Sequence, residues 1–167
     1  MDSDIALIEK EIGRVVEIEE NTFIWKMPSV MAKNFGRLTP FAAADAMPYA
    51  RYVEFDWEDE LTKGILASLA AMFFKRWHFF TGIQTDAKID ESGDLQLQTI
   101  PRRRYVMATH YGPYHQVSHT YRQIVDWADE HNLVLDDESF EFYLNDPRVV
   151  GKENTETMVL IPVYEAT

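Results

Sequence analysis

Acidic and aromatic side chains alternate with apolar ones in the segment Ser-Phe-Glu-Phe-Tyr-Leu at residues 139–144. Successive side chains of a β-strand point to opposite faces of a sheet. If Phe140 and Phe142 face a covering helix, Glu141 and Tyr143 lie together on the opposite, uncovered face. A carboxylate beside aromatic rings can hold a cationic or polar-aromatic group through charge pairing and cation–π contact. The segment therefore predicts a ligand-binding position at Glu141.

Two further segments can bring side chains to the same uncovered face. In residues 105–111, Val106 and Ala108 suit close packing under a helix, which leaves the alternate positions on the other side. The same rule applies to residues 51–55. The resulting set of aromatic, sulfur-containing and polar groups is typical of a small-molecule cleft and consists of Glu141, Tyr143, Tyr105, Met107, Thr109, Tyr111, Tyr52 and Glu54. Trp127 is predicted to anchor the core first and to contact a ligand second.

The same alternation has a plainer explanation, the solvated face of an antiparallel sheet, and the residues alone leave this open. Other reactive groups do not form a known pattern. His110, His115 and His119 are not spaced like a metal site, and Ser118 lacks the motif of a catalytic serine. The chain has no cysteine, and Gly112 stands alone rather than in a phosphate-binding loop. We expect no metal and no cofactor.

The predicted elements repeat one order, strand, helix, strand, strand. Amphipathic spacing and strand-like alternation place the first unit at 50–57, 59–77, 79–85 and 94–100, and the second at 103–111, 117–131, 139–144 and 157–163. Turn residues at 90–93 favour a hairpin between the last two strands of the first unit. One helix can cover only one face of the sheet in each unit, so the other face is packed, solvated or used for binding.

The first 47 residues are predicted to form an extension that packs on the domain. An amphipathic helix is expected over 3–12, ended by Gly13, followed by two or three short strands over 14–33 and a connector over 34–49. The chain then divides into an extension at 1–47 and a domain at 48–167, with repeats at 48–100 and 103–163. The fold class is α+β, one compact domain with antiparallel sheets around a central ligand cleft.

Charge and composition exclude several functions. The 167 residues include 28 acidic and 16 basic side chains, for a formal net charge of −12, and 46% are hydrophobic. The negative electrostatic field of such a chain repels the phosphate backbones of nucleic acids, and the basic run 102–104 is too short to reverse it. The acidic N-terminus lacks the features of a signal peptide, and no stretch has the length of a membrane span. We expect a cytoplasmic protein that contacts neither nucleic acid nor membrane directly.

Four segments of the second unit resemble the GyrI-like small-molecule-binding family, the effector-binding domain of AraC-type and multidrug-responsive bacterial activators. They are HYGPYHQV at 110–117, DWADEHNL at 126–133, FEFYLNDPR at 140–148 and ETMVLIPV at 156–163. The resemblance implies two pseudo-symmetric repeats around a cleft, ligands that stack on aromatic rings, and a pocket acid at the position of Glu141. Such activators carry a DNA-binding domain before this one, and residues 1–47 show no motif of that kind. A stand-alone member is expected.

Three functions follow from the resemblance. The leading hypothesis is that the chain binds, senses or sequesters a cationic, polar-aromatic or hydrophobic small molecule. An alternative is a hydrolase of the cyclopropanoid cyclopropyl type, in which Glu141, helped by Tyr143 or Tyr111, orients or deprotonates water. Another is a gyrase-inhibitory module with a protein partner. The sequence does not decide whether the chain is an enzyme and favours a binding function.

Overall fold

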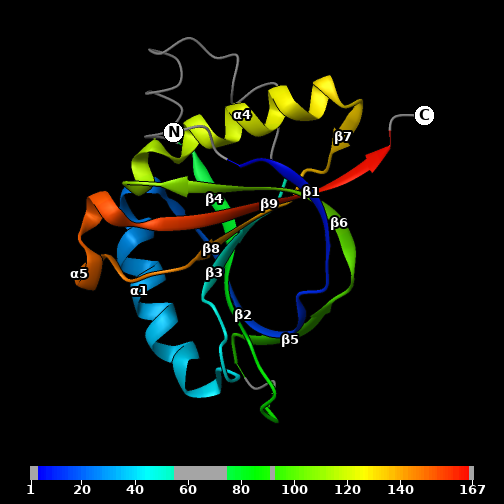
Figure 1. Ribbon diagram of the computed structural model, residues 1–167. Helices are drawn as coiled ribbons and strands as arrows, with labels where there is room; N and C mark the ends of the chain where they lie inside the picture. Colours follow the sequence, from blue (N-terminus) through cyan, green and yellow to red (C-terminus); the bar gives the residue numbers. More distant parts are fainter. Residues whose placement is uncertain (1–3, 55–74, 91–92, 166–167) are drawn as a thin grey trace.

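One antiparallel sheet joins strands from both ends of the described chain (Figure 1). The computed structural model describes residues 4–54, 75–90 and 93–165. Its strands follow the order β1-β6-β9-β8-β3-β4-β2-β5, and β7 pairs with the end of β9. Their bounds are β1 Ala6–Lys10, β2 Gly13–Phe23, β3 Tyr49–Tyr52, β4 Arg76–Gln84, β5 Leu95–Ile100, β6 Arg103–Tyr111, β7 Leu133–Leu135, β8 Ser139–Tyr143 and β9 Glu156–Glu165.

The longer described helices both pack on one face of this sheet, here called the helix face. Helix α1 (Met27–Leu38) covers a cluster on β2 and β4 that includes Val16 and Ile83, and α4 (Val117–Glu130) covers Val106 and Val159. Both lie outside the curl that β1, β2, β5 and β6 make in Figure 1. The shorter helices are α5 Pro147–Val150 and the single turns η1 Ile24–Lys26, η2 Thr39–Phe41, η3 Tyr114–Gln116 and η4 Lys152–Asn154. No helix within the described ranges is long and apolar enough to span a bilayer.

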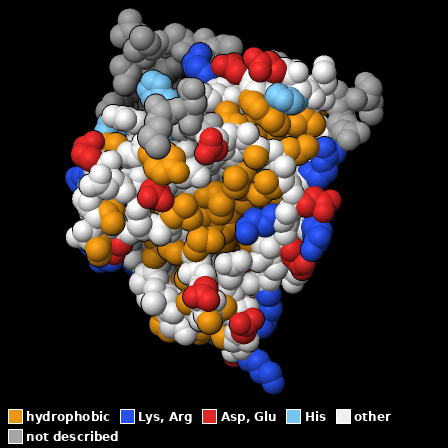
Figure 2. Space-filling model, viewed as in Figure 1, with side chains coloured by type: hydrophobic (Ala, Val, Ile, Leu, Met, Phe, Trp, Pro, Cys, Tyr) orange, Lys and Arg blue, Asp and Glu red, His pale blue; other side chains and the backbone are white. Residues whose placement is uncertain are grey.

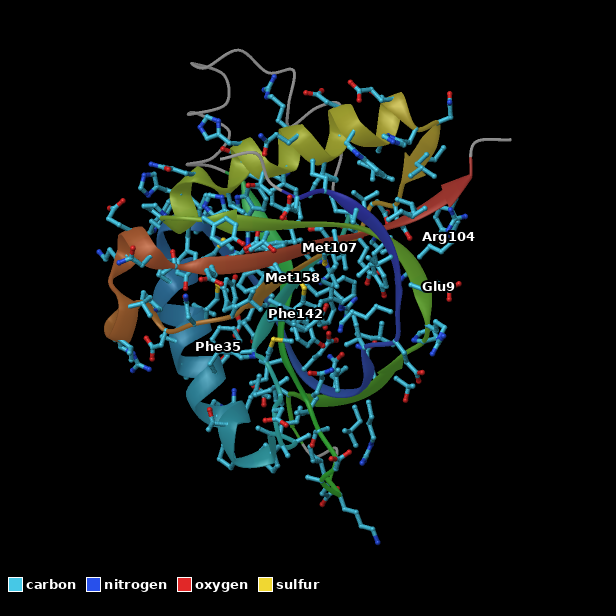
Figure 3. The ribbon with its side chains drawn as sticks, in the orientation of Figure 1. Glu9, Phe35, Arg104, Met107, Phe142 and Met158 are labelled. Atoms are coloured by element: carbon cyan, nitrogen blue, oxygen red, sulfur yellow. The ribbon has the colours of Figure 1, made fainter. Side chains whose placement is uncertain are left out.

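The opposite face, here called the inner face, holds a core of its own. Its side chains point into the curl of the sheet, and the buried members are Ile12, Val15, Tyr49, Ile100, Tyr105, Phe140, Phe142 and Leu160. Met107 and Met158 are partly buried against this core, next to Phe142 (Figure 3). Hydrophobic side chains gather in the middle of the surface viewed in Figure 2. Much of the face that none of the described helices covers is therefore filled by its own residues.

The elements predicted for residues 103–163 are present as β6, α4, β8 and β9. The prediction for residues 3–12 was wrong, because Ala6–Lys10 is a strand that pairs with β6 rather than a helix. The predicted hairpin was also wrong, since β4 and β5 each pair with β2, which lies between them. Long-range strand pairing overrode local turn chemistry and helical spacing in both places.

Residues 14–38 form one long strand and a helix, where short strands and a connector were expected. The sheet therefore crosses the boundary predicted at residue 48, because β2 pairs with β4. The division of the chain at residue 48 stays a prediction. Strand β2, which precedes it, belongs to the same sheet as the strands that follow it. The helix predicted over 59–77 falls mostly outside the described residues, except that Arg76 and Trp77 belong to β4.

Gly82 on β4 lies under the ring of Tyr49. The Tyr49 hydroxyl donates a hydrogen bond of 2.7 Å to Glu17, and the ring crosses Gly82 to reach it. A Cβ atom at residue 82 would collide with this ring. We expect Gly82→Ala to lower the free energy of unfolding by about 1–3 kcal/mol, as overpacking does.

Urea-induced unfolding measures this effect, and Gly36→Ala is the matched control. Gly36 lies within α1, and a Cβ there would meet no atom within 4 Å. Because alanine favours helix over glycine, this variant is expected to gain about 0.5–1 kcal/mol. Equal stability of Gly82→Ala and the native protein would contradict the packing of Tyr49 on Gly82.

Candidate functional site

Glu141 lies near the middle of β8 and is buried, with 8% of its surface exposed. Tyr121 of α4 donates a hydrogen bond of 2.9 Å to its Oε1, and Tyr143 donates one of 3.2 Å to its Oε2. Glu141 therefore faces α4, which corrects the prediction that it lies opposite the helix. The alternation along β8 is as predicted, but Phe140 and Phe142 point into the inner face instead.

The sheet register places Glu141 between apolar residues of the two neighbouring strands. Its partner across β3 is Ala50, and its partner across β9 is Val159. Ser139, two residues earlier on the same face, lies 3.2 Å from the Tyr121 hydroxyl. The carboxylate is thus held between the sheet and α4 by hydroxyl groups.

Aromatic rings surround this carboxylate on the helix face. Tyr52 of β3 is buried with Tyr143 in one cluster, and its ring meets Trp77 edge-on with centroids 6.4 Å apart. The ring of Tyr143 is contacted edge-on by Phe35 of α1 at 5.9 Å and by Tyr114 of η3 at 5.4 Å. Phe35 projects from α1 in Figure 3. Tyr114 is 40% exposed, so this group of rings reaches the surface.

The environment favours the neutral form of each acid in this group. Burial raises the pKa of Glu141 above its usual value, and the hydrogen bonds from Tyr121 and Tyr143 act against this increase. Burial also raises the pKa of the Tyr52, Tyr121 and Tyr143 hydroxyls well above the usual value, and the nearby Glu141 adds to the effect. Among the described residues, no cationic side chain pairs with Glu141. Burying a carboxylate without a countercharge is energetically unfavourable.

The raised pKa of Glu141 predicts how the stability of the fold depends on pH. Because folding raises the pKa of Glu141, its neutral form stabilises the fold fully below the usual pKa of 4.5, and this contribution is lost as pH rises through the raised value. Glu141→Gln has no such loss. We expect the variant to melt a few degrees above the native protein at about pH 7 and at nearly the same temperature at about pH 4. A difference in melting temperature that stays constant between these pH values would contradict the burial of an ionisable Glu141.

The structure divides the predicted site residues between two faces. Tyr52, Glu141 and Tyr143 come together on the helix face. The alternate residues of β6 face the other way, as the sequence predicted, and are therefore separated from Glu141 by the sheet. They are Tyr105, Met107, Thr109 and Tyr111. Tyr105 is fully buried, and burial raises the pKa of its hydroxyl to about 12, whereas Tyr111 is 55% exposed.

The two remaining predicted residues, Glu54 and Trp127, belong to other parts of the structure than the group around Glu141. Glu54 is exposed, in a left-handed backbone conformation with φ of 60°. Trp127 packs against the hydrophobic cluster that α4 forms with β6 and β9, and it stacks on His131 with ring centroids 3.7 Å apart. Tyr121, Tyr114 and Phe35 were missed as site residues. A signal existed for Tyr121, because its spacing with Val117 and Ile124 put it on the buried stripe of the predicted helix.

A second polar cluster lies on the inner face. Glu17 is fully buried and accepts hydrogen bonds from Arg51 at 2.8 and 2.5 Å, from Tyr49 at 2.7 Å and from Gln98 at 2.8 Å. Arg51 also donates to Glu138 at 3.1 Å, and its guanidinium lies 4.0 Å from the Phe80 ring centroid. Both oxygens of Glu17 are thus occupied, so this cluster has a structural role.

A shallow surface depression of about 410 Å³ lies where β5 begins beside β2, lined by Glu19, Glu20, Asn21, His78, Asp94 and Gln96. Its acids already have partners, because His78 lies 2.7 Å from Glu19 and Arg37 lies 2.6 Å from Asp94. Within the described ranges, no three acidic or histidine side chains converge as a metal ion would require. The Glu141 group remains the strongest candidate site.

A family model, the GyrI-like small molecule binding domain, matches residues 75–164, more than half of the chain. The chain belongs to this family. No curated protein sequence matches it significantly. Among solved structures, the EcmrR C-terminal domain is similar with a TM-score of 0.77 at 16% identity, over 99% of this chain and 100% of that domain. In the EcmrR–DNA complex the TM-score is 0.79 at 15% identity, over 98% of this chain, which spans only 58% of the EcmrR chain.

Two further structures share the fold at low identity. SAV2435, solved with bound tetraphenylphosphonium, has a TM-score of 0.57 at 12% identity, over 98% of this chain and 94% of that chain. A hydrolase from Listeria innocua has a TM-score of 0.60 at 13% identity, over 96% of this chain and 91% of that one. These likenesses establish a mixed α and β fold with a curled antiparallel sheet.

Proposed function

We propose that the chain binds organic cations with aromatic or hydrophobic substituents, and that Glu141 is the countercharge. The observation that carries this proposal is the buried carboxylate, whose hydrogen bonds from described side chains come from the hydroxyls of Tyr121 and Tyr143. A bound cation would relieve the burial of this charge, and the surrounding rings would supply apolar and cation–π contacts. The family description supports small-molecule binding, and the tetraphenylphosphonium complex of SAV2435, a structure of the same fold, supports the cationic class.

We also propose that the site lies at the seam of two similar halves. The described elements β2, α1, β3 and β4 follow the order strand, helix, strand, strand, and β6, α4, β8 and β9 follow the same order with the short β7 inserted before β8. The first of these halves begins with β2, ahead of the repeat predicted at 48–100. The two halves meet where β3 pairs with β8, and Glu141 opposite Ala50 lies on this seam.

A thermal-shift screen of the purified chain tests the binding function. Tetraphenylphosphonium and cationic dyes are compared with neutral hydrophobic compounds of similar size. A ligand at 100 times its Kd stabilises the fold by about 2.7 kcal/mol, which raises the melting temperature by roughly 5–10 °C. We expect such shifts with the cations. No shift with any compound would contradict the binding function and favour a protein partner.

Hydrolysis is the second candidate. The observation that favours it is the pairing of a carboxyl of raised pKa with the Tyr121 hydroxyl at 2.9 Å, an arrangement that can transfer or orient a proton. The hydrolase from Listeria innocua has the same fold. Hydrolysis of a substrate with a strained cyclopropyl ring would be measured with the native chain and Glu141→Gln. Equal rates in both would remove Glu141 from any such mechanism.

A further inference from the structure

Thr157 on β9 carries a hydroxyl group that is buried without a partner. Only 1% of the residue is exposed, and its Oγ1 makes no hydrogen bond in the described structure. Thr157 lies between two residues of the helix face, with Tyr143 across β8 and His110 across β6. The next residue of β9 on this face, Val159, is the partner of Glu141. The free hydroxyl therefore lies one pleat away from the buried carboxylate, beside Tyr143.

The neighbours of Thr157 do not use its hydroxyl. The two ring nitrogens of His110 lie 3.0 Å from the Thr120 hydroxyl and 3.1 Å from the Pro113 carbonyl oxygen. The hydroxyl of Tyr143 donates to Glu141. By contrast, the buried hydroxyl of Thr155 donates to the Gly112 carbonyl oxygen. An unpaired buried hydroxyl is unfavourable, and a valine would fill the same volume without it.

We propose that the Thr157 hydroxyl is a ligand contact, which hydrogen-bonds a polar substituent of a cation held by Glu141. This inference rests on the proposed function and narrows its ligand class to organic cations that carry a hydroxyl or amino group on a side arm. Tyr143 is the cross-strand partner of Thr157 and donates its hydroxyl to Glu141, and its ring meets the half-exposed Tyr114. A ligand that moves the Tyr143 ring aside reaches the carboxylate and the Thr157 hydroxyl together.

A pair of matched cations tests this contact. Triphenyl(4-methylphenyl)phosphonium and its 4-hydroxymethyl analogue differ by one hydroxyl group. Isothermal titration calorimetry with the native chain is expected to give about tenfold tighter binding of the hydroxymethyl compound. In Thr157→Val this preference should disappear, while the affinity for the methyl compound and the melting temperature without ligand should be equal to or above the native values. Thr155→Val is the control, expected to lower the melting temperature and to keep the preference.

The outcomes separate this inference from the proposed function. Tight binding of both cations without a preference, or a preference that survives in Thr157→Val, would overturn the role of Thr157 and leave the cation site intact. A loss of affinity for the methyl compound in Thr157→Val equal to that for the hydroxymethyl compound would assign Thr157 a packing role and also overturn the inference. Failure of the native chain to bind either cation would contradict the proposed function itself.

Discussion

Replacement of Glu141 by glutamine is expected to weaken the binding of tetraphenylphosphonium about 30- to 100-fold. Glutamine keeps the size of the side chain and can keep both hydrogen bonds with Tyr121 and Tyr143, but it removes the negative charge. A charged contact in a buried setting contributes about 2–2.7 kcal/mol, which corresponds to this change in Kd. Isothermal titration calorimetry at neutral pH measures both dissociation constants.

Two controls make this result specific. Glu153→Gln removes one exposed carboxylate from η4 and equally reduces the net charge, so its Kd should stay near the native value. Acidification provides the second control, because Glu141 has a raised pKa and its protonation should weaken cation binding above the pH at which an ordinary glutamate titrates. An unchanged Kd in Glu141→Gln would show that the cation binds elsewhere or through the aromatic rings alone.

Arg51→Met is expected to cause the largest loss of stability, about 3–5 kcal/mol. Arg51 is 8% exposed and supplies the only cationic group that pairs with the fully buried Glu17 among the described residues. Methionine fills a similar volume but leaves the Glu17 carboxylate with hydrogen bonds from Tyr49 and Gln98 alone. Urea-induced unfolding, followed by circular dichroism, gives the change in the free energy of unfolding.

Arg37→Met is the matched control for this prediction. Arg37 pairs with Asp94 at 2.6 Å with a bidentate geometry, but both side chains are largely exposed. Exposed pairs contribute about 0–1 kcal/mol, so this variant should unfold close to the native protein. The double variant Glu17→Leu, Arg51→Met should recover part of the stability, because it leaves no unpaired charge. Similar losses of stability in Arg51→Met and Arg37→Met would contradict the structural role of the polar cluster around Glu17 on the inner face.

The sequence predicted the strand positions of the second unit and the alternation along each strand, but not which face Glu141 takes. Residues 139–142 are all buried, so neither face of β8 is exposed to solvent there, and exposure does not distinguish the two faces. Phe140 and Phe142 suit a helix interface as well as the inner core, and only the curl of the sheet decides between them. On β6, the small Ala108 marked the side under α4, and there the prediction was confirmed.

The N-terminal strands were harder to predict because their partners are distant in sequence. Residues 6–10 pair with residues 103–107, and the spacing of Ile5, Ile8 and Ile12 fits a helix as well as a strand. Phe35 of α1 reaches Tyr143 across more than a hundred residues. A rule of local periodicity contains no information on such contacts, so the part of the site contributed by α1 could not be found from the sequence.

A crystal structure of the chain with tetraphenylphosphonium tests the central claim most directly, because it locates the cation on one of the two faces. The expected result is a phosphonium on the helix face beside the Glu141 carboxylate, with its phenyl groups against Tyr143 and Tyr52. A cation on the inner face, beside Met107 and Tyr111 and screened from Glu141 by the sheet, would contradict the assignment of the site. It would also restore the residues of β6 as the ligand contacts.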